Sequence, residues 1–199
     1  MILQEKLRPY RLLLASHSPR RQQLLRDCGL DYTLIDRYEV EERYPAGLPP
    51  HDVPLFLSQL KSDAYPEPLA ANDILLTADT VVVAAGGILG KPHDREDAKN
   101  MLRRLSGREH TVYTGVCISA HGKETVFSEA TKVKFFDLTD KEIADYVLSG
   151  EPMDKAGAYG IQGLGCTLVE GISGDYFNVV GLPVARVVRE IKKITGAEK

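Results

Sequence analysis

The run from Ile74 to Ala85, ILLTADTVVVAA, is the most apolar strand-like segment of this chain and the strongest single constraint on its fold. Its apolar and β-branched residues predict a buried strand. Asp79 places one carboxylate inside that run. An isolated buried charge is costly, so such a group is normally paired, hydrogen-bonded or bound to a metal. The alternative is an exposed residue at a strand end that caps a turn with Thr80, and the residues alone leave both interpretations open.

The segment ASHSPRRQQLL, residues 15–25, follows a short apolar run and predicts the start of a helix. Ser18 suits the N-cap, and Pro19 suits the first helical position because its missing N–H is no loss there. Arg20 and Arg21 then occupy the first turn, where the helix dipole disfavours each cation by about 0.3–1 kcal/mol. Their position is therefore unusual.

A bound anion would reverse the sign of this electrostatic effect. The backbone N–H groups of the helix start, the Ser16 and Ser18 hydroxyls and two guanidinium groups would then all face one negative group. We interpret the segment as a phosphate site. The alternative is that Arg20 and Arg21 are solvated surface charges.

Composition limits the classes of protein to consider. The chain has 199 residues, 43% of them hydrophobic and 27% charged, which is enough to bury a core as one domain over residues 1–199, in two lobes at most. The net charge of −3 argues against a protein that coats nucleic acid, so any basic site must be local. The first residues hold no apolar run as long as a signal-peptide core or a membrane span. Three widely spaced cysteines without a zinc-ligand spacing fit a reduced, cytoplasmic protein.

Periodicity and capping residues predict alternating strands and helices. The expected helices follow Ser18, Asp52 and Asp94, a Thr139-x-x-Glu142 capping box, and Pro183. The expected strands are Leu12–Ala15, Asp31–Ile35, Ile74–Ala85, Thr111–Ala120, Thr125–Phe136, Thr167–Ile172 and Tyr176–Val180, with a hairpin at His121-Gly122 and a glycine-rich loop over Asp154–Gly165. This order predicts an α/β protein with a mixed sheet and flanking helices.

Three further segments carry polar groups suited to a nucleotide. Lys91 follows a glycine turn, but Ala85 and Pro92 rule out a Walker A motif, so the lysine is either solvated or neutralises phosphate oxygens. Glu39, Glu41 and Glu42 form an acidic cluster, either a solvated loop or, beside a triphosphate, a source of oxygens for a hard divalent cation. Gln162 lies in the glycine-rich loop and offers a donor and an acceptor to a base edge; as structure alone, the loop is a flexible connection.

Six segments together resemble one family. They are ASHSPRR, TADTVVV, GKP, LSGREHTVYTGV, EPMDKAGAYGIQG and GDYFNVVGLP, and their order and spacing are similar to those of the Maf nucleoside triphosphate pyrophosphatases, over nearly the whole chain from Leu12 to the final helix. The resemblance implies a twisted mixed sheet in two lobes around a cleft, distantly similar to the inosine triphosphate pyrophosphatases. It also implies cleavage of a nucleoside triphosphate between the α and β phosphates. YGIQG and NVVGLP resemble the branch that prefers dTTP and UTP, with modified pyrimidine nucleotides as further candidates.

The resemblance also assigns roles to individual residues. It implies that Asp79 is the catalytic acid/base and, together with Glu42, a metal ligand for Mg²⁺ or Mn²⁺. The substrate-binding residues that it implies are Ser16, Arg20, Arg21, Lys61, Thr80, Lys91 and Gln162. His17 departs from the family pattern, in which a small residue is usual at that position. A homodimer is the family-level expectation, with neither nucleic acid nor membrane as a partner.

The expected chemistry is metal-assisted hydrolysis. Basic residues would neutralise the triphosphate, and Asp79 would orient or deprotonate the attacking water while pyrophosphate leaves. A nucleotide-binding regulator of cell division, without significant hydrolysis, is the alternative. The carboxylate and lysine expected beside the phosphate site favour the enzyme, because a sensor does not need them.

Overall fold

The computed structural model describes residues 5, 7–120 and 122–196, and the chain divides into two compact units. Unit 1 comprises Met1–Asp79, Thr114–Ser128 and Gly181–Lys199, and unit 2 comprises Thr80–Tyr113 and Glu129–Val180. Three long strands contribute residues to both units: β3 (Asp73–Ala84), β5 (Glu109–Ala120) and β6 (Lys123–Phe135).

The strands form one mixed sheet within the part of the chain that the structure describes. Its order is β2-β1-β3-β5-β6-β7, with β4 paired to β3. β1 (Arg11–Leu14) pairs in parallel with β2 (Thr33–Leu34) and with β3. β4 (Gly87–Leu89) is antiparallel to β3, and β7 (Val169–Ser173) is antiparallel to β6. The predicted mixed α/β architecture is therefore confirmed.

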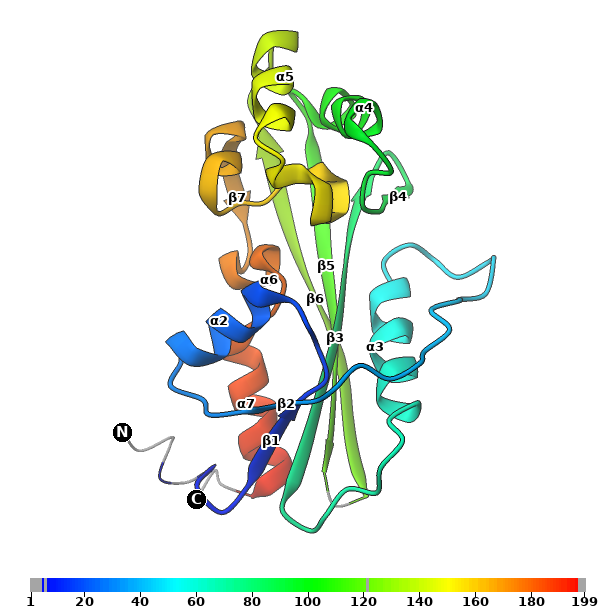
Figure 1. Ribbon diagram of the computed structural model, residues 1–199, viewed down its shortest axis with the longest axis vertical. Helices are drawn as coiled ribbons and strands as arrows, with labels where there is room; N and C mark the ends of the chain where they lie inside the picture. The colour runs from blue at the N-terminus through cyan, green and yellow to red at the C-terminus, as the bar shows by residue number, and fades with distance from the viewer. Residues whose placement is uncertain (1–4, 6, 121, 197–199) are drawn as a thin grey trace. The chain divides into compact units, whose positions relative to one another are not determined.

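Among the described residues, unit 1 includes the helices α2 (Pro19–Asp27), α3 (Val53–Asp63) and α7 (Val184–Thr195). Figure 1 shows α3 on one side of the strands of this unit and α2 and α7 on the other. The buried residues of α7 recur at helical spacing, so this helix turns an apolar face inward. Apolar strand residues such as Leu14, Leu75 and Leu76 are almost fully buried and form the centre of unit 1.

Helix α3 lies unusually close to the strands that it covers. The Thr77 hydroxyl donates a 2.6 Å hydrogen bond to the Ser58 carbonyl, which ties β3 to this helix. At Gly115 in β5, a Cβ atom would overlap the Pro54 carbonyl group. A glycine at this position therefore allows the backbones of β5 and α3 to approach each other.

The start of α2 follows the capping residues expected from the sequence. The Ser18 hydroxyl accepts a 3.5 Å hydrogen bond from the Arg21 backbone N–H, and Pro19 stands at the start of the helix. Cys28 is the C-cap, and Gly29 follows with φ of 69°. The strand β1 and this capped helix together place residues 15–21 at the start of α2.

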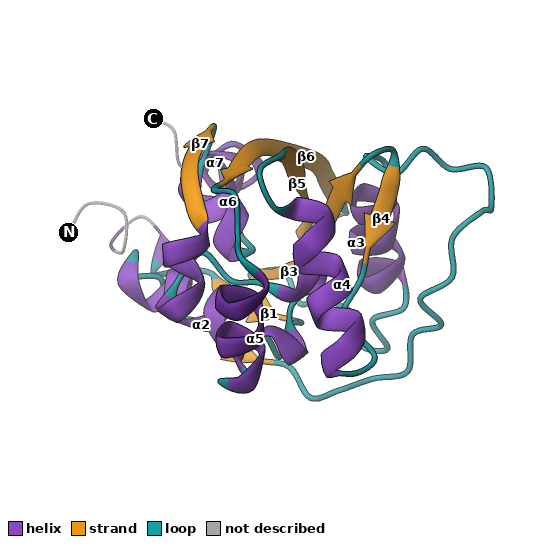
Figure 2. Ribbon diagram, turned by 90° about the horizontal axis from the view of Figure 1, so that it is seen from above, coloured by secondary structure: helices purple, strands orange, loops and turns teal. Residues whose placement is uncertain are grey.

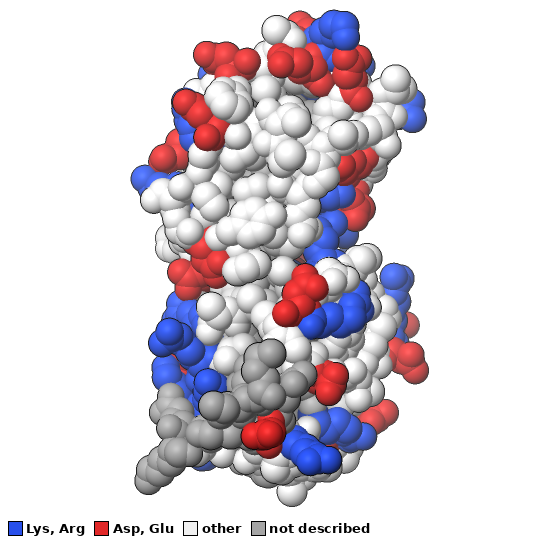
Figure 3. Space-filling view, turned by 90° about the vertical axis from the view of Figure 1, so that its left-hand side faces the viewer, with Lys and Arg blue, Asp and Glu red and all other residues white. Residues whose placement is uncertain are grey.

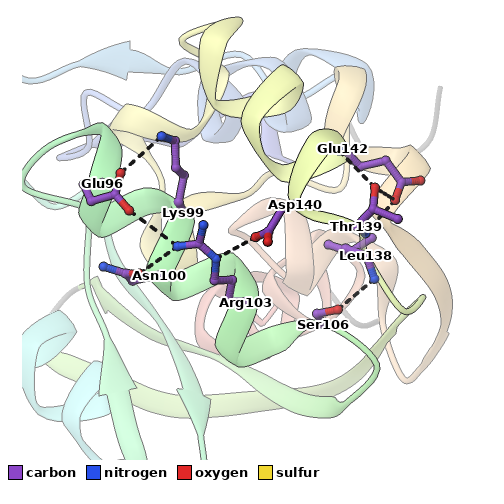
Figure 4. A network of polar contacts seen from close by, with 9 residues as sticks. All are labelled: Glu96, Lys99, Asn100, Arg103, Ser106, Leu138, Thr139, Asp140 and Glu142. Atoms are coloured by element: carbon purple, nitrogen blue, oxygen red, sulfur yellow. Dashed lines mark hydrogen bonds and ion pairs between the residues drawn. The ribbon is translucent and has the colours of Figure 1, made fainter.

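Unit 2 contains α4 (Arg95–Leu105) and α5 (Asp140–Leu148), each capped as predicted. The Asp94 carboxylate accepts a 2.8 Å bond from the Asp97 N–H, and Thr139 and Glu142 form a complete capping box. Figure 4 shows the surface network that links the two helices, in which Arg103 Nε lies 2.8 Å from Asp140 Oδ1. Because these side chains are exposed, the network contributes little to stability.

The core of unit 2 lies beneath these helices. It includes Leu102, Leu105, Phe135 and Val147, all almost fully buried. His110 and Tyr159 are also buried there, and each ring packs edge-on against Phe135. Unit 2 therefore has a hydrophobic core of its own.

Two expectations about unit 2 were wrong. The predicted loop over Asp154–Gly165 is largely built of short 3₁₀ helices: η1 (Glu151–Asp154), η2 (Ala156–Ala158) and η3 (Gly163–Leu168). The segment Tyr176–Val180, predicted as a strand from its aromatic and β-branched residues, is the helix α6. The Asp175 carboxylate accepts the Phe177 N–H at its start, and the Asn178 amide donates to the Val112 carbonyl, so local capping and a buried polar contact override β-propensity.

Two smaller differences concern strand limits. The strand expected over Asp31–Ile35 is limited to Thr33–Leu34, and β7 begins at Val169, because Thr167 belongs to η3. β5 and β6 are neighbours in the sheet, as a hairpin requires, and His121 lies outside the described residues.

Basic and acidic side chains are mixed on the face drawn in Figure 3, with wide uncharged areas between them. Within the described residues, no helix is both long and apolar enough to cross a membrane.

Candidate functional site

A pocket of about 260 Å³ lies in unit 1, beside the start of α2. Its walls come from the β1–α2 connection, from the irregular segment before α3, and from α3 and β3. The lining residues are Ala15, Ser16, His17, Arg21, Ile35, Asp36, Arg37, Tyr38, Val40, Glu42, Lys61 and Ala78. Figure 2 shows in teal the long loop before α3 that carries Tyr38 and Glu42.

Arg21 is held firmly in this pocket. Its Nη1 donates to the Ala78 carbonyl at 2.8 Å and to the Ser16 hydroxyl at 3.0 Å, and its Nε donates to the Gly181 carbonyl at 2.8 Å. Burial lowers the pKa of the guanidinium, and the negative charge of Asp79 opposes that shift. The side chain remains cationic, because arginine stays protonated in proteins. The structure thus fixes one positive charge at the point where β1 leads into α2.

Ser16 completes this end of the pocket. It is 9% exposed, and its hydroxyl accepts hydrogen bonds from the Arg21 side chain and from the Ser18 N–H at 3.5 Å. Arg20 occupies the first turn of α2 next to Arg21 and is not one of the residues that line the pocket. The predicted phosphate site therefore contains Ser16 and Arg21 in one cavity.

Lys61, near the end of α3, contacts two carboxylates. Its Nζ lies 2.7 Å from Asp79 Oδ1 and 3.1 Å from Glu42 Oε2. The Lys61 and Asp79 side chains are each 16% exposed, whereas that of Glu42 is 52% exposed. The carboxylate inside the apolar run is therefore paired, and the interpretation of Asp79 as a turn cap with Thr80 is not needed.

The structure separates the three glutamates of the acidic cluster. Glu42 lines the pocket and reaches Lys61, whereas Glu41 forms a 2.9 Å pair with Arg43 in which both side chains are mostly exposed. Glu39 is exposed and does not line the pocket. Glu42 is thus the member of the cluster that shares a cation with Asp79.

Tyr38 is a pocket residue that sequence reasoning missed. Its hydroxyl donates a 2.6 Å hydrogen bond to the Lys61 carbonyl, and burial raises the pKa of the phenol to about 12. It therefore stays neutral near pH 7 and tethers the loop to α3. The segment from Asp36 to Arg43, DRYEVEER, is mostly charged and has no helical periodicity, so no sequence signal distinguished Tyr38 from its neighbours.

The remaining predicted residues belong to unit 2. Thr80 follows Asp79 directly on β3, Lys91 is exposed after β4, and Gln162 is exposed just before η3. Ser16, Arg21, Glu42, Lys61 and Asp79 are the predicted residues that unit 1 brings together.

The donor set around Lys61 fits a hard divalent cation. Two carboxylates converge on one ammonium, and Mg²⁺ in proteins is typically held by one or two carboxylates together with phosphate oxygens and water. Within the described residues, there is no cluster of three or more histidine, cysteine or acidic residues that could hold a metal. A cation at this site would therefore take its other ligands from substrate and solvent.

Comparison with known proteins identifies the family. Residues 11–194 match the family model described as Maf-like protein. The chain belongs to the Maf family. The match spans both units, as the six sequence segments indicated, and it includes the pocket residues Arg21 and Lys61 and the Asp79 carboxylate paired with Lys61.

Curated Maf relatives are similar over almost their whole length. The dTTP/UTP pyrophosphatase of Phocaeicola vulgatus is 45% identical over 191 residues, covering 96% of this chain and 99% of that protein. The dTTP/UTP pyrophosphatase of Bacillus anthracis is 48% identical over 183 residues, covering 92% and 95%. Among solved structures, a nucleoside-triphosphatase (dITP/XTP pyrophosphatase) from Mycobacterium abscessus has a TM-score of 0.44 at 15% identity, covering 92% of this chain and 98% of that chain.

Proposed function

We propose that this Maf protein hydrolyses nucleoside triphosphates, dTTP and UTP above all, between the α and β phosphates, giving a monophosphate and pyrophosphate. The observation that carries the proposal is the position of Lys61, whose ammonium lies between Asp79 and Glu42 at the pocket that contains Arg21. A triphosphate requires positive charge for binding, and its hydrolysis requires a carboxylate near that charge. The names of the curated relatives support the same reaction and the same two nucleotides.

Phosphate binding is assigned to the start of α2. The Arg21 guanidinium and the Ser16 hydroxyl offer donors to an anion in the pocket. We assign Arg20 to the same phosphates on the family resemblance. With these groups in place, phosphate binding explains why two arginines occupy a helix start that would otherwise favour acids.

A divalent cation, Mg²⁺ or Mn²⁺, is part of the proposal, with Asp79 and Glu42 as the residues that would hold it. When bound, such an ion supplies charge neutralisation and polarises phosphate oxygens and water. With the cation between the two carboxylates, the Lys61 ammonium would pair with a phosphate oxygen instead of with Asp79 and Glu42.

Asp79 is the proposed catalytic residue. Its carboxylate, held in place by the surrounding buried strand, would orient or deprotonate the water that attacks the α phosphorus. Negative charge then grows on the departing pyrophosphate, and the fixed positive charges of Arg21 and Lys61 stabilise it. We expect this pre-placed charge to provide most of the rate enhancement.

Other parts of the proposal rest on the family resemblance. Thr80, Lys91 and Gln162 complete the substrate-binding set, with Gln162 reading the base edge, and residues 1–199 act as one functional domain. We further propose a homodimer, and a cytoplasmic location, for which the free state of Cys28, Cys117 and Cys166 is the support. Neither nucleic acid nor a membrane is proposed as a partner.

The proposal is tested by a pyrophosphate-release assay. All common nucleoside triphosphates and several modified pyrimidine nucleotides are each supplied with Mg²⁺, with Mn²⁺, or with a chelator. We expect release from dTTP and UTP with either metal and none with the chelator. Release from none of the nucleotides, with binding retained, would instead identify a nucleotide-binding regulator.

A further inference from the structure

The segment of unit 2 that carries Gln162 is anchored by side-chain contacts on both sides of this residue. Before it, the Gly160 N–H donates a 3.2 Å hydrogen bond to the Tyr146 hydroxyl. After it, the Leu164 and Gly165 N–H groups donate to the two oxygens of the Glu151 carboxylate, each at 3.0 Å. The segment is therefore not the flexible connection that its glycines would allow.

The two anchors are themselves joined. The Tyr146 hydroxyl donates a 3.0 Å hydrogen bond to Glu151 Oε1, so Tyr146 and Glu151 bridge the chain before and after Gln162. Tyr146 is 5% exposed, and it is held in the core of unit 2 as part of α5. The support beneath the Gln162 segment is thus a buried ring on a regular helix.

Glycines allow the backbone to fit closely over this support. A Cβ atom at Gly163, where φ is +66°, would lie 2.6 Å from Glu151 Oε2, and one at Gly165 would lie 2.7 Å from the Tyr146 hydroxyl. Gln162 itself is exposed, while Ile161 and Gly165 on either side of it are buried. The arrangement holds the backbone of residue 162 and leaves its amide side chain free to meet a ligand.

We propose that Glu151 is a positioning residue for base recognition: it holds Gln162 in the orientation in which its amide reads the edge of uracil or thymine. This inference rests on the proposed function. The carboxylate suits the task because it only accepts hydrogen bonds, and three donors converge on it. An amide in its place would direct its own N–H₂ group at one of those donors.

The kinetic test compares UTP with CTP. Uracil presents an N–H donor and a carbonyl acceptor at the edge where cytosine presents a ring-nitrogen acceptor and an amino donor. In Glu151→Gln, we expect KM for UTP to rise and the UTP-to-CTP ratio of kcat/KM to fall by about tenfold, the effect of weakening a few hydrogen bonds to one residue. Gln162→Ala should lower the same ratio at least as much, and in Glu151→Gln the loss should lie mainly in KM rather than in kcat. Tyr146→Phe removes one of the hydroxyl groups that support the segment. Its UTP-to-CTP ratio of kcat/KM should lie between that of wild type and that of Glu151→Gln.

The matched control is Glu142→Gln. Glu142 is an exposed carboxylate of the same unit that also accepts a backbone N–H, from Thr139, but lies in the capping box of α5. This variant should keep the wild-type ratio. Equal losses for UTP and CTP in Glu151→Gln, or an unchanged ratio, would overturn the proposal, since a purely structural residue affects every nucleotide alike.

A second measurement does not depend on the reaction. Amide hydrogen exchange of the ligand-free protein should show Leu164 and Gly165 less protected in Glu151→Gln, by about tenfold, and unchanged in Glu142→Gln. Unchanged protection would overturn the inference even if the enzyme is active. If wild-type protein releases pyrophosphate from no nucleotide, the proposed function and with it the base-reading role fail, while the exchange result still decides whether Glu151 holds the segment.

Discussion

Lys61 is the residue on which the charges of the pocket converge. Two carboxylates lie within 3.1 Å of its ammonium, so its removal would leave Asp79 and Glu42 facing one another without a shared cation. The lysine therefore serves the site both as a donor and as a partner for the acids.

Lys61→Met is expected to lower kcat/KM for dTTP by about a hundredfold, because a pre-placed positive charge is lost where charge develops. Steady-state kinetics of pyrophosphate release measures the change. Lys132→Met, which removes an exposed lysine paired with Glu109, should behave as wild type. A kcat/KM for Lys61→Met close to that of wild type would show that the ammonium is not part of the reaction.

The direction of water attack gives another test at this scale. If water attacks the α phosphorus, hydrolysis of dTTP in water labelled with heavy oxygen should place the label in the monophosphate. Mass spectrometry of the two products locates it. Label in the pyrophosphate would place the attack on the β phosphorus and contradict the assigned geometry of the phosphates around Asp79.

At the scale of single elements, α3 is placed by its contact with the sheet. Gly115→Ala would force its Cβ against the Pro54 carbonyl group, so α3 would have to move, and with it Lys61. We expect a loss of about 1–3 kcal/mol in the free energy of unfolding, together with a lower kcat. Denaturant unfolding and the release assay measure both.

Gly47→Ala is the control for that substitution, because a Cβ at Gly47 meets no atom within 4 Å. It should leave stability and activity unchanged. If Gly115→Ala were as stable and as active as Gly47→Ala, the close packing of α3 on β5 would not be what positions Lys61.

Some of the helices could be predicted from local sequence patterns and others could not. Helix starts were predictable because Ser18, Asp94 and Thr139 cap through contacts within a few residues. Helix α6 was not, because its aromatic and β-branched residues favour a strand and the long-range contact that holds Asn178 leaves no local pattern. The 3₁₀ helices around Gln162 depend in the same way on Glu151 and Tyr146.

The residues of the candidate site can be divided in the same way, into those that the sequence predicted and those that only the structure revealed. Arg21 and Asp79 could be found from the sequence because each violates a local expectation, a cation at a helix start and a charge in an apolar strand. Tyr38 and Glu151 follow no such rule, since only the folded chain brings them to Lys61 and to the Gln162 segment. Residues that conflict with their local sequence pattern, such as Arg21 and Asp79, could thus be identified as functional candidates from the sequence. Tyr38 and Glu151, which hold other candidate residues in place, could be identified only from the structure.

At the scale of the whole molecule, His110 links folding to pH. It is 3% exposed in the core of unit 2, its Nε2 lies 2.7 Å from the Tyr159 hydroxyl, and its Nδ1 has no hydrogen-bond partner. Burial lowers the pKa of the imidazole to about 4, from an ordinary 6.5. The folded protein therefore keeps His110 neutral at pH values where the unfolded chain protonates it.

The sign of the effect follows from proton binding. Between pH 6.5 and about 4 the unfolded state binds the extra proton, so stability is retained above this window and falls as the pH drops through it. We expect His110 to account for a loss of roughly 2–4 kcal/mol across the window. Denaturant titrations of wild type and His110→Gln should show a flatter pH dependence in the variant, and identical slopes would contradict a buried neutral imidazole.

The two units hold different parts of the proposed site. Unit 1 holds the pocket lined by Arg21 and Lys61, with Asp79 paired to Lys61, and unit 2 holds the supported segment of Gln162. Under the proposed function, bond cleavage takes place in unit 1 and base choice depends on unit 2. We propose above all that the carboxylate of Asp79, paired with Lys61, performs the reaction on a triphosphate bound at the start of α2.

Asp79→Asn tests that claim most directly, because it keeps the size of the side chain and removes its charge. With dTTP and Mg²⁺, we expect kcat to fall by about a thousandfold, the scale of a lost acid/base group. Calorimetric titration with a non-hydrolysable dTTP analogue should meanwhile give a Kd close to that of wild type. Turnover near the wild-type rate in this variant would contradict the account.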